Sequence, residues 1–398
     1  MTKSSVHGAR VGIVANPVSG RDIRRLVAHA SVFPIAEKCN MVTRLLAGLG
    51  ATGVERVLIM PDVGGVAERL RRAIASQDSL DAWPEVDFLD MPVEDGPTDT
   101  VHAVGRMVAA KVSAIVVLGG DGTHRLVASA CGEIPVMALS TGTNNVFPAM
   151  REATIAGMAT GLVATGRVSK ADATIRNKVL RVEINGCACE VAVVDASISS
   201  HWWTGSKALW RPETLNQIFV TFAEAGAMGL SSVAGLLNPV SRNAAHGLRV
   251  DLAPAETAAL TVQAPIAPGL VAPVGVAGVY KISPGEPQSL RIPRGVIALD
   301  GEREIEFQSD QQVILRLDVD GPLTIDIERV MAKATQNGLL VARQHGIQEG
   351  EPLMVPTTAP PRMKMPIPFH RRGAGVGCPE PEDPPRKLTA SAPPERGF

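Results

Sequence analysis

Ile115-Val116-Val117-Leu118-Gly119-Gly120-Asp121-Gly122-Thr123 joins a short run of β-branched and aliphatic residues to three glycines, a carboxylate and a hydroxyl group. An apolar run of this length is typical of a buried parallel strand. Glycines allow a tight turn and let a polyphosphate approach unshielded amide groups, and the N-terminus of a following helix attracts anions. The sequence therefore predicts a strand that ends at a phosphate site, followed by a helix within residues 124–130.

Asp121 is the charged residue of this turn. A carboxylate does not attract phosphate, so its position favours Mg²⁺ binding or removal of a proton from an attacking hydroxyl group. Capping of the following helix is the alternative, because aspartate is a common residue at helix N-termini. Asp121 is thus the candidate catalytic and metal-binding residue, with helix capping as the competing interpretation.

Two other predicted strands end in loops of small, hydrogen-bonding residues. The strand at 11–15 is followed by Asn16-Pro17-Val18-Ser19-Gly20, and the strand at 134–139 by Ser140-Thr141-Gly142-Thr143-Asn144-Asn145. Such side chains, and amides next to glycine, bind phosphate, ribose or base atoms. Each loop taken alone is also explained as an ordinary turn after a strand. Three loops of this kind at the ends of strands favour a nucleotide site.

Strands and helices alternate through the first third of the chain. Hydrophobic patterning predicts strands at 11–15, 54–60, 86–90, 115–118 and 134–139, and helices at 36–49, 66–74, 98–110 and 124–130. The cluster Thr98-Asp99-Thr100 is expected to cap the third of these helices. This alternation predicts an α/β domain with an open, mostly parallel, Rossmann-like sheet that binds ligands at the carboxyl ends of its strands.

The pattern changes after residue 166, where short strands become frequent. Asn185-Gly186 predicts a hairpin between strands at 179–185 and 190–195, and helices are predicted at 215–225 and 228–237. Further short strands are predicted at 248–252, 258–262, 276–282, 289–292, 296–299, 304–307, 313–317 and 323–327. We therefore expect a larger β-sandwich as the second domain.

Four regions follow from these patterns. We predict an α/β nucleotide-binding domain at 1–146, a β-rich acceptor-binding domain at 147–330, a closing helix that packs back within 331–350, and a proline-rich disordered tail at 351–398.

Composition excludes several classes of protein. The chain has 398 residues, 45% hydrophobic and 20% charged, with a formal net charge of -1, so charge gives no reason to expect a nucleic-acid partner. The N-terminus lacks the apolar core of a signal peptide, and no apolar run reaches the roughly 20 residues of a membrane-spanning helix. Five cysteines are too few and too irregular for a disulfide framework. We expect a cytoplasmic protein without membrane insertion.

The three loops carry a resemblance to known kinases. Asn-Pro-x-Ser-Gly at 16–20, Gly-Gly-Asp-Gly-Thr at 119–123 and Gly-Thr-Asn-Asn at 142–145 resemble the nucleotide-binding motifs of the superfamily that contains ATP-dependent NAD kinases, diacylglycerol kinases and sphingosine kinases. The Asn-Asn-Val-Phe-Pro continuation at 144–148 and the tryptophan-rich segment 202–210 look most similar to the acetoin-catabolism X proteins, a group described as NAD-kinase-like. The resemblance covers most of residues 10–330 and implies a two-domain kinase fold with the active site in the cleft between the domains.

The resemblance also implies roles for individual residues. Asp121 would hold Mg²⁺ or serve as the base, and Glu302, in the sequence Asp300-Gly301-Glu302, matches a glutamate that activates the acceptor hydroxyl in the lipid-kinase branch. The residues implied to bind nucleotide are Asn16, Ser19, Gly20, Gly119, Gly120, Gly122, Thr123, Thr141, Gly142, Thr143, Asn144 and Asn145. Asn145 departs from the pattern, because lipid kinases usually carry aspartate and NAD kinases glutamate at this position.

Three functions are compatible with this set. The first is a phosphotransferase of NAD-kinase type that uses ATP and Mg²⁺ to phosphorylate a hydroxyl group of NAD, giving NADP; the resemblance also implies a homo-oligomer. The second is a lipid or small-diol kinase, favoured by Asp300-Gly301-Glu302 and the tryptophan-rich segment. The third is a nucleotide-binding accessory protein of acetoin catabolism with little turnover, favoured by the missing acid at Asn145.

Overall fold

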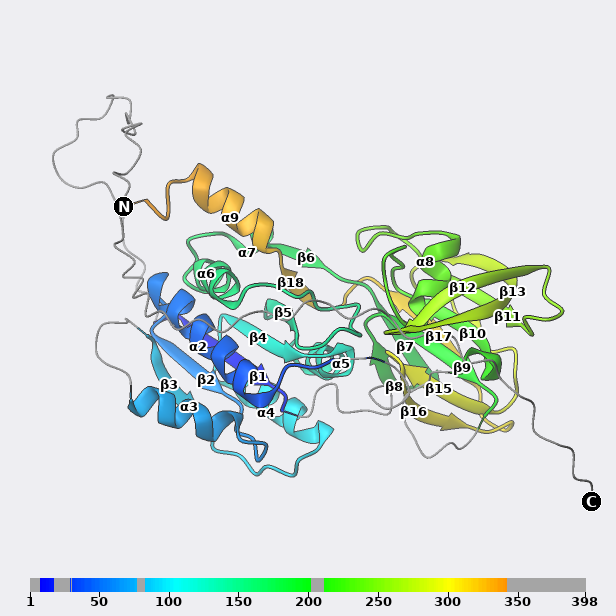
Figure 1. Ribbon diagram of the computed structural model, residues 1–398, viewed down its shortest axis with the longest axis horizontal. Coiled ribbons are helices and arrows are strands. Elements are labelled where there is room, and N and C mark those ends of the chain that lie inside the picture. Colours follow the sequence, from blue (N-terminus) through cyan, green and yellow to red (C-terminus); the bar gives the residue numbers. More distant parts are fainter. Residues whose placement is uncertain (1–7, 18–28, 30, 77–82, 202–210, 342–398) are drawn as a thin grey trace, which may run out of the picture. The chain divides into compact units, whose positions relative to one another are not determined.

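The computed structural model of the protein describes residues 8–17, 29, 31–76, 83–201 and 211–341 (Figure 1). Element labels are those of Figure 1. No helix within these ranges is long and apolar enough to cross a membrane.

A seven-stranded sheet forms the first domain, as the alternating pattern predicts. Its strands lie in the order β3 (Glu85–Phe88), β2 (Arg56–Ile59), β1 (Arg10–Ala15), β4 (Ala114–Gly119), β5 (Val136–Ser140), β18 (Leu323–Ile325) and β6 (Thr174–Arg176). All neighbours pair in parallel except β18 and β6. The chain leaves β1 toward β3 on one side and continues from β4 toward β5 on the other, which makes the β1–β4 pair a topological switch point, where open α/β sheets bind ligands.

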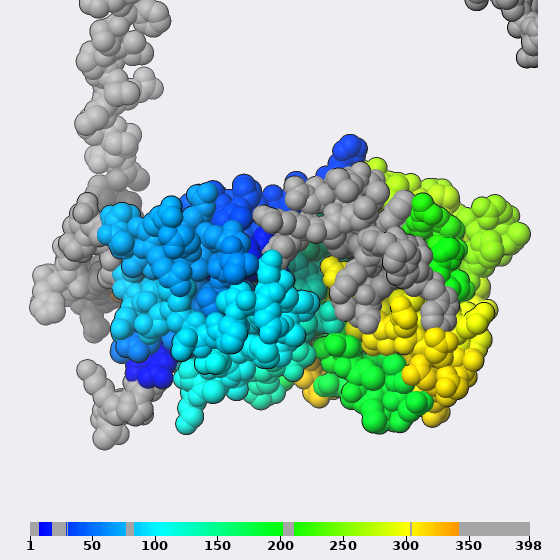
Figure 2. Space-filling view, turned by 90° about the horizontal axis from the view of Figure 1, so that it is seen from below, coloured from blue at the N-terminus to red at the C-terminus, as the bar shows by residue number. Residues whose placement is uncertain are grey.

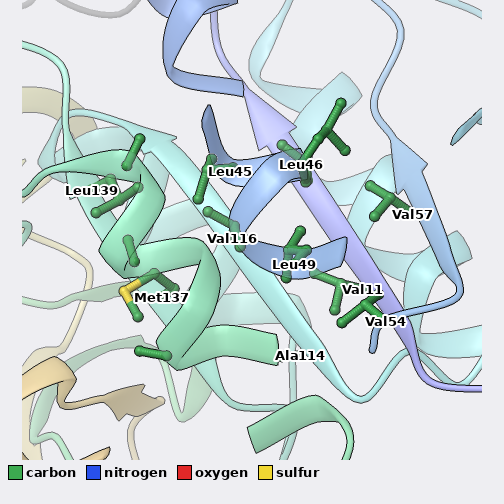
Figure 3. Close-up of a cluster of buried hydrophobic side chains, with 14 of the residues drawn as sticks. Val11, Leu45, Leu46, Leu49, Val54, Val57, Ala114, Val116, Met137 and Leu139 are labelled. Atoms are coloured by element: carbon green, nitrogen blue, oxygen red, sulfur yellow. The ribbon is translucent and has the colours of Figure 1, made fainter. Parts of the chain in front are cut away.

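Helices cover both faces of this sheet. One face packs against α2 (Ile35–Ala51), α3 (Val66–Ala75), α6 (Ala153–Ala164) and α9 (Ile327–Gln336), and the other against α4 (Pro97–Ala109) and α5 (Asp121–Ala130). Figure 3 shows how Leu45, Leu46 and Leu49 of α2 lie over Val11 and Val116 of the sheet. A further turn, α7 (Lys170–Ala173), precedes β6.

Helix α6 is an element that the sequence analysis did not predict. Nine of its twelve residues are buried and its exposed residue Ile155 is apolar, so it lacks the polar face that reveals an amphipathic helix. Two glycines bring it against α2: a Cβ at Gly48 would lie 2.4 Å from the carbonyl oxygen of Thr154, and a Cβ at Gly157 would lie 2.5 Å from that of Leu45. The helices therefore pack backbone to backbone, which a larger residue at either position would prevent.

A β-sandwich forms the second domain and confirms the predicted fold class. One sheet has the order β12 (Leu260–Ala267), β13 (Leu270–Ile282), β11 (Gly247–Ala253), β10 (Leu215–Val220), β9 (Asp195–Ser199), β15 (Gly295–Leu299) and β16 (Glu302–Phe307). The other has the order β14 (Gln288–Ser289), β17 (Val313–Asp318), β7 (Val179–Ile184) and β8 (Cys187–Ala192). Apolar side chains fill the space between the sheets, among them Phe219, Ile297 and Leu315.

The helix predicted at 215–225 is wrong. Residues Leu215–Val220 form β10, a central strand that follows the short 3-10 turn Pro212–Thr214 and pairs with β9 and β11. Ile218 packs under helix α8 (Ser231–Leu237) on one face, and Phe219 packs between the two sheets on the other. Because both faces are covered, the strand has no apolar–polar alternation, and its apolar run resembles a helix in sequence.

Two helix starts differ from the prediction. Helix α5 begins at Asp121 rather than within 124–130, directly after the glycine turn. Helix α4 has Gly96 as its N-cap residue, with Pro97 next, so the cluster at 98–100 lies inside the helix. Asp99 still stabilises this end, because its carboxylate accepts hydrogen bonds from the backbone amides of Glu94 and Gly96.

Candidate active site

The glycine turn between β4 and α5 packs tightly against its surroundings. A Cβ at Gly119 would lie 2.6 Å from Cβ of Thr123, and a Cβ at Gly120 would lie 2.8 Å from Oδ1 of Asn145. At Gly119 the neighbour is a Cβ atom close to the backbone, so a side chain there would displace α5; at Gly120 a side chain would displace the end of the Asn145 side chain. The turn leads into the N-terminus of the ten-residue helix α5, where the unpaired amides of a first turn and the helix dipole favour an anion.

Asn16, at the end of β1, lies beside this turn. Its Nδ2 donates to Oγ1 of Thr123 at 2.9 Å, and its backbone amide donates to the carbonyl oxygen of Leu118 at 3.1 Å. The start of the first predicted loop, at Asn16, thus meets the second loop at the switch point between β1 and β4.

Lys38 of α2, which the sequence motifs did not single out, binds the backbone at the start of the same loop. Its side chain is buried, with 1% exposure, and Nζ donates to the carbonyl oxygens of Asn16 and Pro17 at 2.9 and 3.1 Å. A lysine on the apolar face of the helix predicted at 36–49, three residues before Met41, was the signal that could have revealed it. Its positive charge stabilises the backbone of Asn16 and Pro17 and orients their carbonyl groups toward Nζ.

The third loop, residues 140–145, contacts the glycine turn and the residues that precede α2. The amide of Thr141 donates to the carbonyl oxygen of Gly119 at 3.3 Å, and Nδ2 of Asn145 donates to Oγ of Ser140 at 2.7 Å. Thr143 exchanges hydrogen bonds with the backbone of Ser31. Within the described residues, Oδ1 of Asn144 is buried without a hydrogen-bond partner. An unsatisfied buried acceptor next to a glycine turn suits a ligand donor such as an amino or hydroxyl group.

Asp121 binds the backbone of residues far along the chain. Its carboxylate oxygens each accept the amide of Val146 at 3.0 Å, and Oδ1 also accepts the amide of Phe147 at 2.8 Å. The competing interpretation, capping of α5, is therefore replaced by a long-range anchor, because these amides belong to the segment after the third loop. Asp121 holds the turn and that segment together.

Glu302 reaches the same place from the β-sandwich. Its carboxyl atoms lie 4.0 Å from the position that a Cβ on Gly122 would occupy. The hairpin between β15 and β16 positions it: Asp300 and Gly301 have φ values of 49° and 84°, the left-handed conformations that a two-residue turn needs. The structure therefore brings Asp121 and Glu302, which are distant in sequence, to one glycine turn.

Asp300 is the buried support of this hairpin. Its carboxylate accepts the backbone amides of Val193, Val194 and Asp195 at 3.1, 2.8 and 3.1 Å. Burial and, after it, the nearby charge of Asp121 raise the pKa of Asp300 to about 7. The carboxylates of Asp300 and Asp121 therefore interact across the boundary between the two domains.

This raised pKa predicts a pH-dependent stability. An aspartate in the unfolded chain has a pKa of about 3.9, so the native state retains a proton on Asp300 that the unfolded state releases. The resulting stabilisation is complete below about pH 4 and is lost as the pH rises through about 7. We expect the free energy of urea unfolding to fall by roughly 2 kcal/mol between about pH 5 and about pH 8 through this group. Asp300→Asn, which cannot ionise, should remove that part of the slope; an unchanged slope would contradict the assignment.

Two more residues of α5 complete the site and were not predicted. Burial lowers the pKa of His124 to about 4, so the ring is neutral, and its Nδ1 lies 2.8 Å from the carbonyl oxygen of Gly120, which places the proton on Nδ1. The ring packs at 5.7 Å from that of Phe147. Arg125, also buried, pairs with Glu190 of β8 at 3.0 Å and joins the two domains. Figure 2 shows the first domain, drawn mainly in blue and cyan, meeting the green and yellow second domain.

The acidic residues at the turn fit a hard cation only in part. Mg²⁺ prefers carboxylate, phosphate and water oxygens in octahedral geometry. Within the described ranges, no three His, Cys, Asp or Glu side chains form a set that would hold a metal ion. Asp121 and Glu302 are the carboxylates beside the turn, so a bound Mg²⁺ would take its other ligands from a polyphosphate and water.

Of the predicted site residues, Ser19 and Gly20 lie outside the described residues, as does the tryptophan-rich segment 202–210.

Comparison with known proteins gives matches to both domains. The family model described as the ATP-NAD kinase N-terminal domain matches residues 11–168, and the model described as the acetoin catabolism protein X C-terminal domain matches residues 178–320. Acetoin catabolism protein X of Cupriavidus necator is 47% identical over 335 residues, which cover 83% of this chain and 93% of that protein.

Two solved structures are similar to this chain at low sequence identity. Yeast NADH kinase complexed with NADH gives a TM-score of 0.45 at 14% identity, covering 85% of this chain and 90% of that one. A putative diacylglycerol kinase from Bacillus anthracis str. Sterne gives a TM-score of 0.39 at 13% identity, covering 80% of this chain and 96% of that one.

Proposed function

The chain belongs to the acetoin catabolism protein X family, and on this premise we propose that it is an ATP-dependent phosphotransferase of NAD-kinase type. It transfers the γ-phosphoryl group of ATP to a ribose hydroxyl group of NAD and produces NADP and ADP. The match of residues 11–168 to the ATP-NAD kinase N-terminal domain supports this choice of donor and acceptor.

One observation carries the proposal: the start of the first strand-end loop, the third loop and a glutamate from the other domain all reach the glycine turn. Asn16 contacts Thr123, Thr141 contacts Gly119, and Glu302 lies beside Gly122. Phosphoryl transfer requires mainly positioning and charge stabilisation, which amides, a cation and an oriented hydroxyl group supply. The neutral donors of the loops would bind the phosphates, and the two carboxylates would hold the cation and orient the hydroxyl group.

The residues divide the work as follows. The amides of the glycine turn and of the first turn of α5 bind oxygens of the β- and γ-phosphates. Oδ1 of Asn144 accepts a hydrogen bond from the nucleotide. Glu302 accepts the proton of the acceptor hydroxyl group while the oxygen of that hydroxyl group bonds to the γ-phosphorus. The bond from the γ-phosphorus to the β–γ bridging oxygen breaks, and ADP leaves. Mg²⁺, held by Asp121 and the phosphates, would neutralise charge on the transferred group.

A direct assay tests the proposal. Purified protein is incubated with ATP, Mg²⁺ and NAD, and NADP is measured by a dehydrogenase that accepts only NADP. We expect NADP to form in proportion to ADP and to require both ATP and Mg²⁺. Absence of NADP, while a known NAD kinase works in the same mixture, would refute the assignment of the acceptor.

A second acceptor class is favoured by one feature. The hairpin Asp300-Gly301-Glu302 places a carboxylate at the phosphate turn, as a kinase for simple alcohols requires. The same assay therefore includes diacylglycerol, a sphingoid base and small diols, with ADP formation as the readout. ATP binding without ADP formation from any acceptor would indicate the accessory protein instead. The homo-oligomer and the cytoplasmic location stay predictions from the sequence.

A further inference from the structure

Arg242 of the β-sandwich domain contacts the backbone segment that holds Asp121. It lies in the loop between α8 and β11, and its Nη2 and Nη1 donate to the carbonyl oxygens of Val146 and Phe147 at 2.6 and 2.9 Å. The amides of the same two residues donate to the carboxylate of Asp121. A cation and an anion from different domains therefore bind opposite sides of one backbone segment.

One peptide group connects the two charges directly. The carbonyl group of Val146 and the amide of Phe147 belong to the same peptide unit, so Arg242 binds its oxygen and Asp121 binds its N–H. A positive charge at the oxygen polarises the unit and strengthens donation from the nitrogen, because hydrogen bonds in a chain reinforce one another. Arg242 and Asp121 therefore interact indirectly, through one polarised peptide group.

Arg242 is held in this geometry from several sides. Its guanidinium carbon lies 4.1 Å from the ring centroid of Phe222 and 5.6 Å from that of Phe147, and its Nε pairs with Glu224 at 3.1 Å. The side chain is 28% exposed. These cation–π contacts and the ion pair hold the guanidinium group where both of its terminal nitrogens reach the backbone.

Lys178 fixes the loop that carries Arg242. It is a buried lysine in the connection from β6 to β7, and its Nζ donates to the carbonyl oxygens of Ser241, Ala244 and His246 at 3.2, 2.7 and 2.8 Å. Desolvation lowers the pKa of Lys178 to about 8. Three carbonyl groups around one ammonium group hold the loop in a single shape, so Arg242 is supported by the second domain rather than by solvent.

We propose that Arg242 is a positioning residue that acts through the Val146–Phe147 peptide group. Through this group it fixes the carboxylate of Asp121 for phosphoryl transfer. The phosphate site is therefore ready for transfer only when the β-sandwich domain, which carries Arg242, is docked. The inference rests on the proposed function for its effect on catalysis. The hydrogen bonds that link Arg242 to Asp121 through this peptide group do not depend on which acceptor the enzyme uses.

The test is a double-mutant cycle with Arg242→Met and Asp121→Asn, measured in urea unfolding and in phosphotransfer. Each single substitution should raise the equilibrium constant for unfolding. The double substitution should raise it about 10-fold less than the product of the two single increases. In catalysis, Arg242→Met should lower kcat about 10-fold with little change in KM for ATP, and Asp121→Asn should remove that dependence on residue 242. Arg242→Lys, which keeps the charge but not the two-pronged geometry, should recover part of kcat.

Two controls separate this role from general stability. Arg249→Met removes another partly buried arginine that stacks on an aromatic ring, Tyr280 at 4.4 Å, without reaching Val146 or Phe147. This variant should leave the activity of the protein near that of the wild type, with no coupling to Asp121. Glu224→Gln removes the ion pair of Arg242 and leaves its backbone contacts, so it should lower kcat less than Arg242→Met does. Additive unfolding effects of Arg242→Met and Asp121→Asn would overturn the inference, whereas coupled unfolding without any phosphotransfer would overturn only the proposed function.

Discussion

Asp121→Asn is expected to lower kcat for phosphotransfer about 10³-fold, because it removes a charge at the phosphate turn with almost no change in shape. The structure adds a second expectation. The asparagine side chain replaces one acceptor oxygen by a donor that faces the amides of Val146 and Phe147, so the free energy of unfolding should fall by about 1–3 kcal/mol. Steady-state kinetics and urea unfolding at one pH measure the two effects.

Asp99→Asn is the matched control for this change. Like Asp121, Asp99 lies in the first turn of a helix and its carboxylate accepts backbone amides, here those of Glu94 and Gly96. It stabilises the start of α4, the helix that leads from the edge strand β3 to β4. Asp99→Asn should cost a comparable amount of stability and leave kcat unchanged. If Asp121→Asn kept wild-type turnover, Asp121 would have a purely structural role as the anchor of Val146.

Glu302→Gln is expected to lower kcat about 10³-fold while the KM for ATP changes little. The reason is that a neutral amide no longer accepts the proton of the attacking hydroxyl group, whereas the amides of the glycine turn still bind the phosphates. The carboxylate lies beside Gly122, so the substitution changes the chemistry at that point without removing a packing partner.

Glu306→Gln serves as the control, because Glu306 lies on the same strand, β16, and is exposed. It should have no effect on kcat. A titration with Mg²⁺ distinguishes a base from a metal ligand: if Glu302→Gln regains wild-type kcat at high Mg²⁺ concentration, Glu302 binds the cation and is not the base.

Local sequence patterns predicted the elements that depend on local physics. The aliphatic run 115–118 and its glycines predicted a buried strand and a tight turn, and both are present as β4 and the start of α5. Asn185-Gly186 predicted a hairpin, and these residues have φ values of 52° and 79° between β7 and β8. Patterns failed where burial on all sides erased periodicity, as in α6 and in β10.

The sequence by itself determined which chemical groups stand at the ends of the strands: asparagines, hydroxyl groups, glycines and one aspartate. The tertiary structure alone decided what these groups contact, because a side chain that binds a distant backbone group leaves no period in the sequence. Asp121 reaches Val146, Lys38 reaches Asn16, and Glu302 reaches Gly122 only after the strands are ordered and the hairpin at Asp300 is closed. Charge and hydrogen bonding act over a few ångströms, so the site exists only once folding has brought these groups within that distance.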